Sequence, residues 1–191
     1  PESGLHRSED GGETWTELKS GLPNYAGKIG FTLSPQKPDV LYASIELEKR
    51  NGAVYKSEDR GSSWKKMSDL SLGYGTGPHY YQELFASPHK FDRLYLMNVR
   101  ILTSEDGGKT FVELTERSKH SDNHAIAFRE DDPNYLLVGT DAGIYESFDL
   151  AKTWKYHKNL PITQFYKVAV NNAYPFYHIF GGTQDLSLIH I

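Results

Sequence analysis

The chain contains no cysteine, which excludes disulfides, thiol nucleophiles and zinc sites built on thiolates. It has no run of about 18 apolar residues, so the sequence predicts no membrane-spanning helix. It also lacks a basic surplus: 21 Lys and Arg stand against 25 Asp and Glu, a net charge of −4, which argues against a dedicated nucleic-acid binder. No segment shows the apolar stripe and capping residues of an amphipathic helix.

Glycine and aromatic residues, in contrast, are abundant. The 191 residues include 17 glycines, 13 tyrosines, 9 phenylalanines and 3 tryptophans. Aromatic side chains favour strands, and glycine favours tight turns. With 38% hydrophobic and 24% charged residues, the composition is that of a globular protein rather than a disordered one.

One eight-residue phrase occurs four times along the chain. Its copies start 49, 47 and 43 residues apart, at 8–15, 57–64, 104–111 and 147–154. Each period contains four short apolar or alternating stretches separated by turn residues; in the second period they are 29–33, 40–45, 53–57 and 64–67. A four-stranded antiparallel unit repeated at this spacing is typical of a β-propeller blade.

The fold prediction is therefore an all-β propeller of four-stranded antiparallel blades. The chain holds about four blades' worth of strands, which we expect to be part of a larger ring. The expected propeller region is 1–185, with blade units at 3–18 (partial), 27–68, 80–115, 122–158 and 164–185 (partial).

The repeated phrase has a mechanical explanation as the turn between the third and fourth strands. Asp and Ser side chains bond to the amides of the turn, and Gly adopts a left-handed conformation at little cost. The aromatic residue that follows is expected to bury its ring between neighbouring sheets. These residues therefore have a structural role rather than a catalytic or calcium-binding one: Ser8, Asp10, Gly12, Trp15, Ser57, Asp59, Gly61, Trp64, Ser104, Asp106, Gly108, Phe111, Ser147, Asp149 and Trp154.

The phrase Ser-x-Asp-x-Gly-x-Thr-Trp is the Asp-box, or bacterial neuraminidase repeat, so the chain resembles Asp-box β-propellers. The first copy matches all five signature positions, and the others each depart at one, at Ser63, Phe111 and Ala151. Sialidases, xyloglucanases, photosystem-assembly factors and sortilin-type receptors all carry such boxes. The box therefore indicates the fold and leaves the activity open.

Segments between the boxes resemble bacterial sortilin-type propeller proteins, which are often labelled glycosyl hydrolases. These segments are 120–125, 132–134, 139–145, 160–166 and 181–185. The resemblance implies a large exported protein, extracellular or periplasmic, with peptide, protein or carbohydrate partners.

The chain departs from that pattern at three places. Asn123 stands where the family usually has His, and Leu150-Ala151 replace the usual Gly-Gly of the box. Because a left-handed Ala costs about 1 kcal/mol, we expect the fourth turn to take another shape. The last six residues, 186–191, do not continue the pattern, and we expect them to be a non-native tail of a truncated fragment.

Aligning the repeats on one another sets the register of the four innermost strands. Two apolar levels, which we expect to be buried, hold Phe31, Leu84, Ile126 and Val168, and Leu33, Ala86, Phe128 and Val170. Two further levels lie above them on the same face and are more polar. One holds Ile29, Gln82, His124 and Tyr166, and the other holds Gly27, Tyr80, Asp122 and Gln164. Because side chains alternate along a strand, the polar levels are expected at the upper rim of the channel.

The polar residues of this rim have two interpretations, a hydrogen-bonded network that caps the channel and a site of ligand recognition. His120, Asp122 and His124 are spaced to form a His–carboxylate pair or a cation site. Same-face neighbours on a strand lie about 7 Å apart, which argues against shared tetrahedral coordination, so no metal is assigned. The capping network is the favoured interpretation of these residue types, and ligand recognition is the alternative. The candidate ligand-binding residues are Tyr80, Gln82, His120, Asp122, His124, Gln164, Tyr166 and Gln184.

Two functions compete. The first is a non-catalytic interaction module of a larger exported protein that binds peptide, protein or glycan and needs no cofactor. The second is part of a xyloglucanase-like glycoside hydrolase, which requires a pair of carboxyl groups. The candidate catalytic carboxyls outside the boxes are Asp122, Asp141, Glu83 and Asp185. A sialidase would need an arginine triad for the substrate carboxylate, and Arg100 is essentially the lone arginine expected at the rim.

Overall fold

The computed structural model describes residues 3–48, 51–71, 82–160, 164–183 and 189–190, and within them every defined element is a β-strand. Three complete four-stranded antiparallel sheets confirm the predicted all-β, four-stranded units. They are β3 (Ile29–Leu33), β4 (Leu41–Glu46), β5 (Asn51–Ser57) and β6 (Lys65–Ser71); β7 (Leu84–Ala86), β8 (Leu94–Leu96), β9 (Leu102–Ser104) and β10 (Val112–Glu113); and β11 (Asn123–Arg129), β12 (Asp132–Thr140), β13 (Gly143–Ser147) and β14 (Lys155–Tyr156).

Incomplete sheets flank these three. On the N-terminal side lies the two-stranded pair β1 (Leu5–Arg7) and β2 (Thr16–Leu18). On the C-terminal side, β15 (Phe165–Val170) and β16 (Ile179–Thr183) pair with a third, two-residue strand, β17 (Ile189–His190). The sequence predicts only two strands here, and β17 arises within the segment expected to be a non-native tail.

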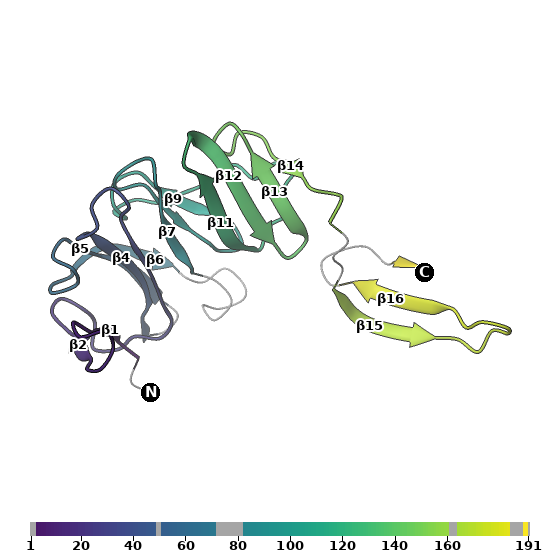
Figure 1. The fold of residues 1–191 in the computed structure, drawn as a ribbon, viewed down its shortest axis with the longest axis horizontal. Helices are drawn as coiled ribbons and strands as arrows, with labels where there is room; N and C mark the ends of the chain where they lie inside the picture. The colour runs from purple at the N-terminus through teal and green to yellow at the C-terminus, as the bar shows by residue number, and fades with distance from the viewer. Residues whose placement is uncertain (1–2, 49–50, 72–81, 161–163, 184–188, 191) are drawn as a thin grey trace.

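The sheets follow one another along an arc, with the β15–β16 hairpin projecting at the far end (Figure 1). The first strands of neighbouring sheets, β3 and β7, lie beside each other, so the chain runs from the inside of each blade outward. We call the side that carries the first-to-second loops and the Asp-boxes the lower face, and the opposite side the upper face. No helix in the described part of the chain is long and apolar enough to cross a membrane.

Alternating side chains fill the spaces between blades. On β4, Ala43 and Ile45 pack with Leu5 toward the first pair of strands, whereas Tyr42 packs with Leu84 toward the third sheet. A third cluster, which includes Tyr95, Ile126 and Leu136, joins the third and fourth sheets. The complete sheets are thus covered on two faces where another sheet adjoins them, as blade packing requires.

The two apolar levels of the innermost strands are buried only where a neighbouring sheet covers them. Leu84 and Ile126 are 3% and 7% exposed, and Ala86 and Phe128 are partly buried. The prediction is wrong for the other four positions, Phe31, Leu33, Val168 and Val170, which are 54–61% exposed. On β3 the reason is that β1 and β2 leave the inner part of its face uncovered; β15 lies apart from the β11–β14 sheet (Figure 1).

The four Asp-box turns repeat one hydrogen-bond pattern on the lower face. In the second turn, the amide of Gly61 donates to Ser57 Oγ at 2.8 Å and the amide of Ser63 donates to Asp59 Oδ1 at 2.8 Å. The fourth turn keeps this shape, contrary to expectation: Leu150 and Ala151 adopt φ of 55° and 69°. The Ala151 amide still donates to Ser147 Oγ, at 2.9 Å, so the bonds of the turn offset the left-handed strain.

The aromatic residue of each box packs toward the preceding blade. Trp64 is 6% exposed and packs with Ala43 and Tyr55, and Phe111 and Trp154 pack in the next two interfaces. The expectation of a buried ring fails at Trp15, which is 62% exposed, because among the described sheets none precedes the β1–β2 pair to cover it.

Asp106→Ala is expected to lower the melting temperature at neutral pH. The Thr110 amide, together with the hydroxyls of Thr110 and Ser104, lowers the pKa of Asp106 from 3.8 to about 2. A depressed folded-state pKa contributes stability that is present above pH 3.8 and lost as the pH falls toward 2. In thermal scans, the difference in melting temperature between wild type and Asp106→Ala should therefore narrow as the pH falls over that interval. A difference that stays constant, or that the exposed control Glu113→Ala also shows, contradicts a stabilising role for the Asp106 carboxylate.

Candidate functional site

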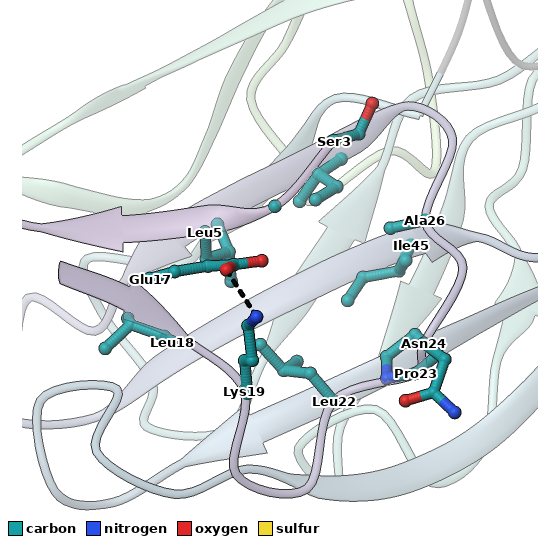
Figure 2. Close-up of a pocket in the computed structure, with 12 residues that line it drawn as sticks. Ser3, Leu5, Glu17, Leu18, Lys19, Leu22, Pro23, Asn24, Ala26 and Ile45 are labelled. Atoms are coloured by element: carbon teal, nitrogen blue, oxygen red, sulfur yellow. Dashed lines mark ion pairs between the residues drawn. The ribbon is translucent and has the colours of Figure 1, made fainter. Parts of the chain in front are cut away.

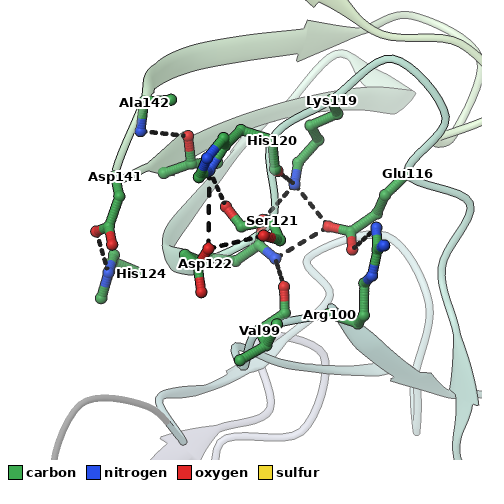
Figure 3. Close-up of polar contacts among 12 residues, drawn as sticks. Val99, Arg100, Glu116, Lys119, His120, Ser121, Asp122, His124, Asp141 and Ala142 are labelled. Atoms are coloured by element: carbon green, nitrogen blue, oxygen red, sulfur yellow. Dashed lines mark hydrogen bonds and ion pairs between the residues drawn. The ribbon is translucent and has the colours of Figure 1, made fainter. Parts of the chain in front are cut away.

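Polar side chains gather on the upper face of the β11–β14 sheet (Figure 3). They come from the crossover 114–122 that precedes β11, from β11 itself, and from the loop between β12 and β13. His124 Nε2 lies 2.7 Å from Asp141 Oδ1, with the two side chains 39% and 32% exposed. His120 Nδ1 lies 2.9 Å from the Ser121 carbonyl and 3.9 Å from Asp122 Oδ2, which accepts a 2.7 Å bond from Ser121 Oγ. The rim thus carries two His–carboxylate contacts, of which His124–Asp141 is a hydrogen bond and His120–Asp122 is a wider approach; we call them the two His–carboxylate pairs.

The predicted alternation of His120, Asp122 and His124 along one strand face is wrong. Strand β11 begins at Asn123, so the first two residues lie in the crossover. Asp122 has a φ of 61°, and the β11–β12 register shifts between Asn123 and Ala125. Because the left-handed residue and the bulge both break the period of two, His124 pairs with Asp141 and not with Asp122.

A buried ionic cluster lies beneath the rim (Figure 3). Lys119 Nζ and Glu116 Oε1 are 2.6 Å apart, with side-chain exposures of 0% and 1%. Lys119 also donates to the carbonyl of His120 at 2.8 Å and to Asn123 Oδ1. The half-exposed Arg100 Nη1 lies 3.5 Å from Glu116 Oε2. Burial lowers the pKa of Lys119, although Glu116 acts in the opposite direction.

Asn123 connects this cluster to the neighbouring blade. Its fully buried amide Nδ2 donates to Glu116 Oε1 at 2.9 Å, to Asn98 O at 3.1 Å and to Val99 O at 3.0 Å. The position at which the sequence departs from the sortilin-type pattern is therefore the centre of a hydrogen-bond network.

Sequence reasoning missed Lys119 and Glu116. Charged residues in a short crossover are ordinarily solvated, so these two were not expected to be buried. One signal was present: counted from the start of the Asp-box, the matching positions in the first repeat are Ser20 and Pro23, which are uncharged.

Several predicted ligand-binding residues lie elsewhere. Gln82 is 2% exposed and so does not face solvent at the rim. Its φ of 87° turns the chain inward, and its carbonyl accepts a 2.9 Å bond from Ser44 Oγ. Tyr166, 72% exposed, lies on β15, and Gln164 just precedes that strand. The β15–β16 hairpin stands apart from the β11–β14 sheet that carries His124 (Figure 1). Tyr80, Gln184 and Asp185 fall outside the described residues.

The candidate catalytic carboxylates that the structure describes each have a partner. Glu83 Oε1 lies 2.7 Å from Lys28 Nζ, at the junction of the second and third blades. Asp122 and Asp141 belong to the pairs described above, and the Asp141 amide donates to the Asp122 carbonyl at 3.2 Å. Within the described ranges, no group of three His, Asp or Glu side chains is arranged to hold a metal ion.

Two hollows lie away from these pairs. One, of about 150 Å³, is enclosed by β1, β2 and the segment 22–29, with the ion pair of Glu17 and Lys19 beside it (Figure 2). The other, of about 380 Å³, lies on the lower face between the second and third Asp-boxes, where Asp59, Trp64 and Asp106 line it. Neither is lined by a predicted ligand-binding residue.

The fold and its Asp-boxes define a β-propeller, and comparison with known proteins agrees. No protein-family model matches the chain. A probable oligoxyloglucan-reducing end-specific xyloglucanase of Neosartorya fischeri is 26% identical over 162 residues, which are 76% of this chain and 19% of that protein.

Solved structures give the same result. The GH74 enzyme of Niastella koreensis matches with a TM-score of 0.55 at 17% identity, over 82% of this chain and 26% of its own. An ancestral GH74 enzyme matches with a TM-score of 0.59 at 11% identity, over 98% of this chain and 28% of its own. YCF48 from Cyanidioschyzon merolae matches with a TM-score of 0.52 at 14% identity, over 90% of this chain and 58% of its own. The similarity is distant, and the chain spans only part of each of these proteins.

Proposed function

We propose that this chain is a non-catalytic interaction module of a larger exported β-propeller protein and binds a peptide, protein or glycan at its upper face. The observation that carries the proposal is the pair of part-exposed His–carboxylate contacts at the rim, next to a fully buried ion pair whose Lys119 donates to the His120 carbonyl. Polar groups held in place before binding lose little entropy when a ligand arrives. The exported location rests on the resemblance alone, and fractionation of cells that make the full-length protein tests it.

The partners of the carboxylates favour binding over hydrolysis. A glycosidase needs one protonated carboxyl and one carboxylate, separated by about 5–5.5 Å or 6.5–9.5 Å, with access to the sugar. Asp141 is bound to His124, Asp122 to Ser121 and Glu83 to Lys28. Each of these carboxyl groups thus already has a polar partner that orients its oxygens, an arrangement suited to accepting hydrogen bonds from a ligand.

A xyloglucanase-like hydrolase is the second candidate. The 26% identity to a probable xyloglucanase over 162 residues favours it. Asp122 and Asp141 supply two carboxyl groups on one face, since a 3.2 Å hydrogen bond joins their main chains.

Asp122→Ala is expected to weaken ligand binding about tenfold while leaving the fold intact, because it removes a charged hydrogen-bond acceptor from the rim. Ligands are first selected from a random peptide display library and a glycan array that includes xyloglucan, and are then titrated by calorimetry. The matched control, Asp131→Ala, removes an exposed lower-face carboxylate paired with Arg129 at 2.6 Å and should bind normally.

Reducing-end release from xyloglucan is measured in parallel. Release by wild type that Asp122→Ala abolishes would establish the hydrolase instead. Equal affinities for Asp122→Ala and Asp131→Ala would remove the upper face from the binding site.

A further inference from the structure

The fully buried ion pair of Glu116 and Lys119 is unusual for its place in the fold. A buried pair seldom stabilises a protein more than apolar residues of the same volume do. The first crossover, 19–28, performs the same connection, and there the positions that match Glu116 and Lys119 are the uncharged Ser20 and Pro23. Burying charge is therefore no requirement of the blade-to-blade connection, and the pair calls for another explanation.

We propose that Lys119, Glu116 and Asn123 are positioning residues that hold the segment 120–122 in one conformation and thereby orient the two His–carboxylate pairs. Lys119 has three ammonium donors, and three acceptors surround it: Glu116 Oε1, the His120 carbonyl and Asn123 Oδ1. The rings of Trp154 and Tyr145 lie 5.4 and 5.9 Å from the ammonium. Any shift of the His120 carbonyl would leave a buried charged donor unpaired, which is costly.

Hydrogen bonds extend from the buried cluster of Lys119, Glu116 and Asn123 to residues of both His–carboxylate pairs. Asn123 Nδ2 fixes the carbonyl of Val99, and that carbonyl accepts the Asp122 amide at 2.9 Å. The Asp122 carbonyl in turn accepts the Asp141 amide at 3.2 Å, and Asp141 holds His124. A continuous set of hydrogen bonds thus connects Lys119 with the His124 imidazole, and Lys119 holds His120 directly through its main-chain carbonyl. The consequence for binding rests on the proposed function, whereas the ordering of segment 120–122 does not.

The test is the double variant Lys119→Met/Glu116→Leu, which removes both buried charges and retains apolar volume. Its melting temperature should equal or exceed that of wild type, because apolar replacement of a buried pair is neutral or stabilising. Amide hydrogen exchange at Asp122 should nevertheless accelerate by about tenfold or more, as local opening becomes easier. The imidazole resonances of His120 and His124 should move toward those of a free histidine. Affinity for the selected peptide or glycan should fall about tenfold, since the rim is no longer preorganised.

The matched control is Arg129→Met/Asp131→Leu, which removes an ion pair of equal length, 2.6 Å, from the exposed lower face. It should change neither the exchange at Asp122 nor the affinity. Wild-type exchange and wild-type imidazole shifts in the first double variant overturn the positioning role, as does faster exchange with unchanged affinity. If wild type binds none of the selected probes, the proposed function fails, while exchange and imidazole shifts still decide the positioning role.

A second variant covers the case in which the double variant does not fold. Asn123→Leu keeps the ion pair of Lys119 and Glu116 but removes the bonds to Asn98 and Val99. It should give the same loss of protection at Asp122, and retained protection in it overturns the proposal.

Discussion

Trp64→Ala is expected to lower the free energy of unfolding by about 3–5 kcal/mol, the usual cost of deleting a buried aromatic ring. The indole is 6% exposed and packs against Ala43, Ile45 and Tyr55, between the first strand pair and the second sheet. Its loss opens a cavity that two separate sheets line, and neither sheet can close it without moving as a whole. Urea unfolding followed by circular dichroism measures the change.

Trp15→Ala is the matched control, because Trp15 holds the same position in the first Asp-box. Trp15 and Trp64 each donate from Nε1 to the carbonyl of a box glycine at 3.0 Å, so this bond cancels in the comparison. Trp15 is 62% exposed, and its removal should cost within about 0.5 kcal/mol of zero. Equal losses in the two variants would mean that the box aromatics act through the turn and not through packing between blades.

Glu116→Leu is expected to cost about 3–5 kcal/mol at neutral pH, because it leaves the ammonium of Lys119 buried without a counter-charge. The Lys119 side chain is 0% exposed, so water cannot replace the carboxylate. Addition of Lys119→Met should restore the stability to the wild-type level or above, since no unpaired charge then remains buried.

The penalty for Glu116→Leu should also decrease as the pH rises. Burial already lowers the pKa of Lys119 below its ordinary 10.5, and loss of Glu116 lowers it further. Between the folded pKa and 10.5 the unfolded chain binds more protons, so the stability of the variant rises with pH in that interval. Urea unfolding at neutral and alkaline pH measures this. A penalty that is the same at both, or a double variant as unstable as Glu116→Leu, would contradict the burial of an unpaired cation.

The fold could be predicted from sequence because the repeat and its chemistry agree. The Asp-box places a turn between the third and fourth strands, and alternating apolar residues place strands on either side. The predicted strand 29–33 matches β3, and the predicted 40–45 and 53–57 differ from β4 and β5 by one or two residues. The exposure of Phe31 and Trp15 could not be predicted in this way, because the burial of a side chain depends on which sheets lie beside it.

The candidate site was predictable only in outline. The repeat register placed His124 and Asp122 at the upper end of the innermost strand; His124 lies there on β11, whereas Asp122 is in the crossover just before it. It could not reveal the left-handed Asp122 or the bulge in β11, because both are local departures from the regular alternation on which the register rests. The burial of Lys119 depends on acceptors from its own crossover and from Asn123, which no single-residue preference predicts.

The most direct test of the proposed role is to map ligand-induced amide shifts by NMR on isotope-labelled protein, with the selected peptide or glycan as the probe. We predict shifts centred on Asp122, Asn123 and Asp141 at the upper face, with no new reducing ends released from xyloglucan. Shifts centred on the Asp-box turns at Asp59 and Asp106, or turnover of xyloglucan, would contradict a binding module that acts through its upper rim.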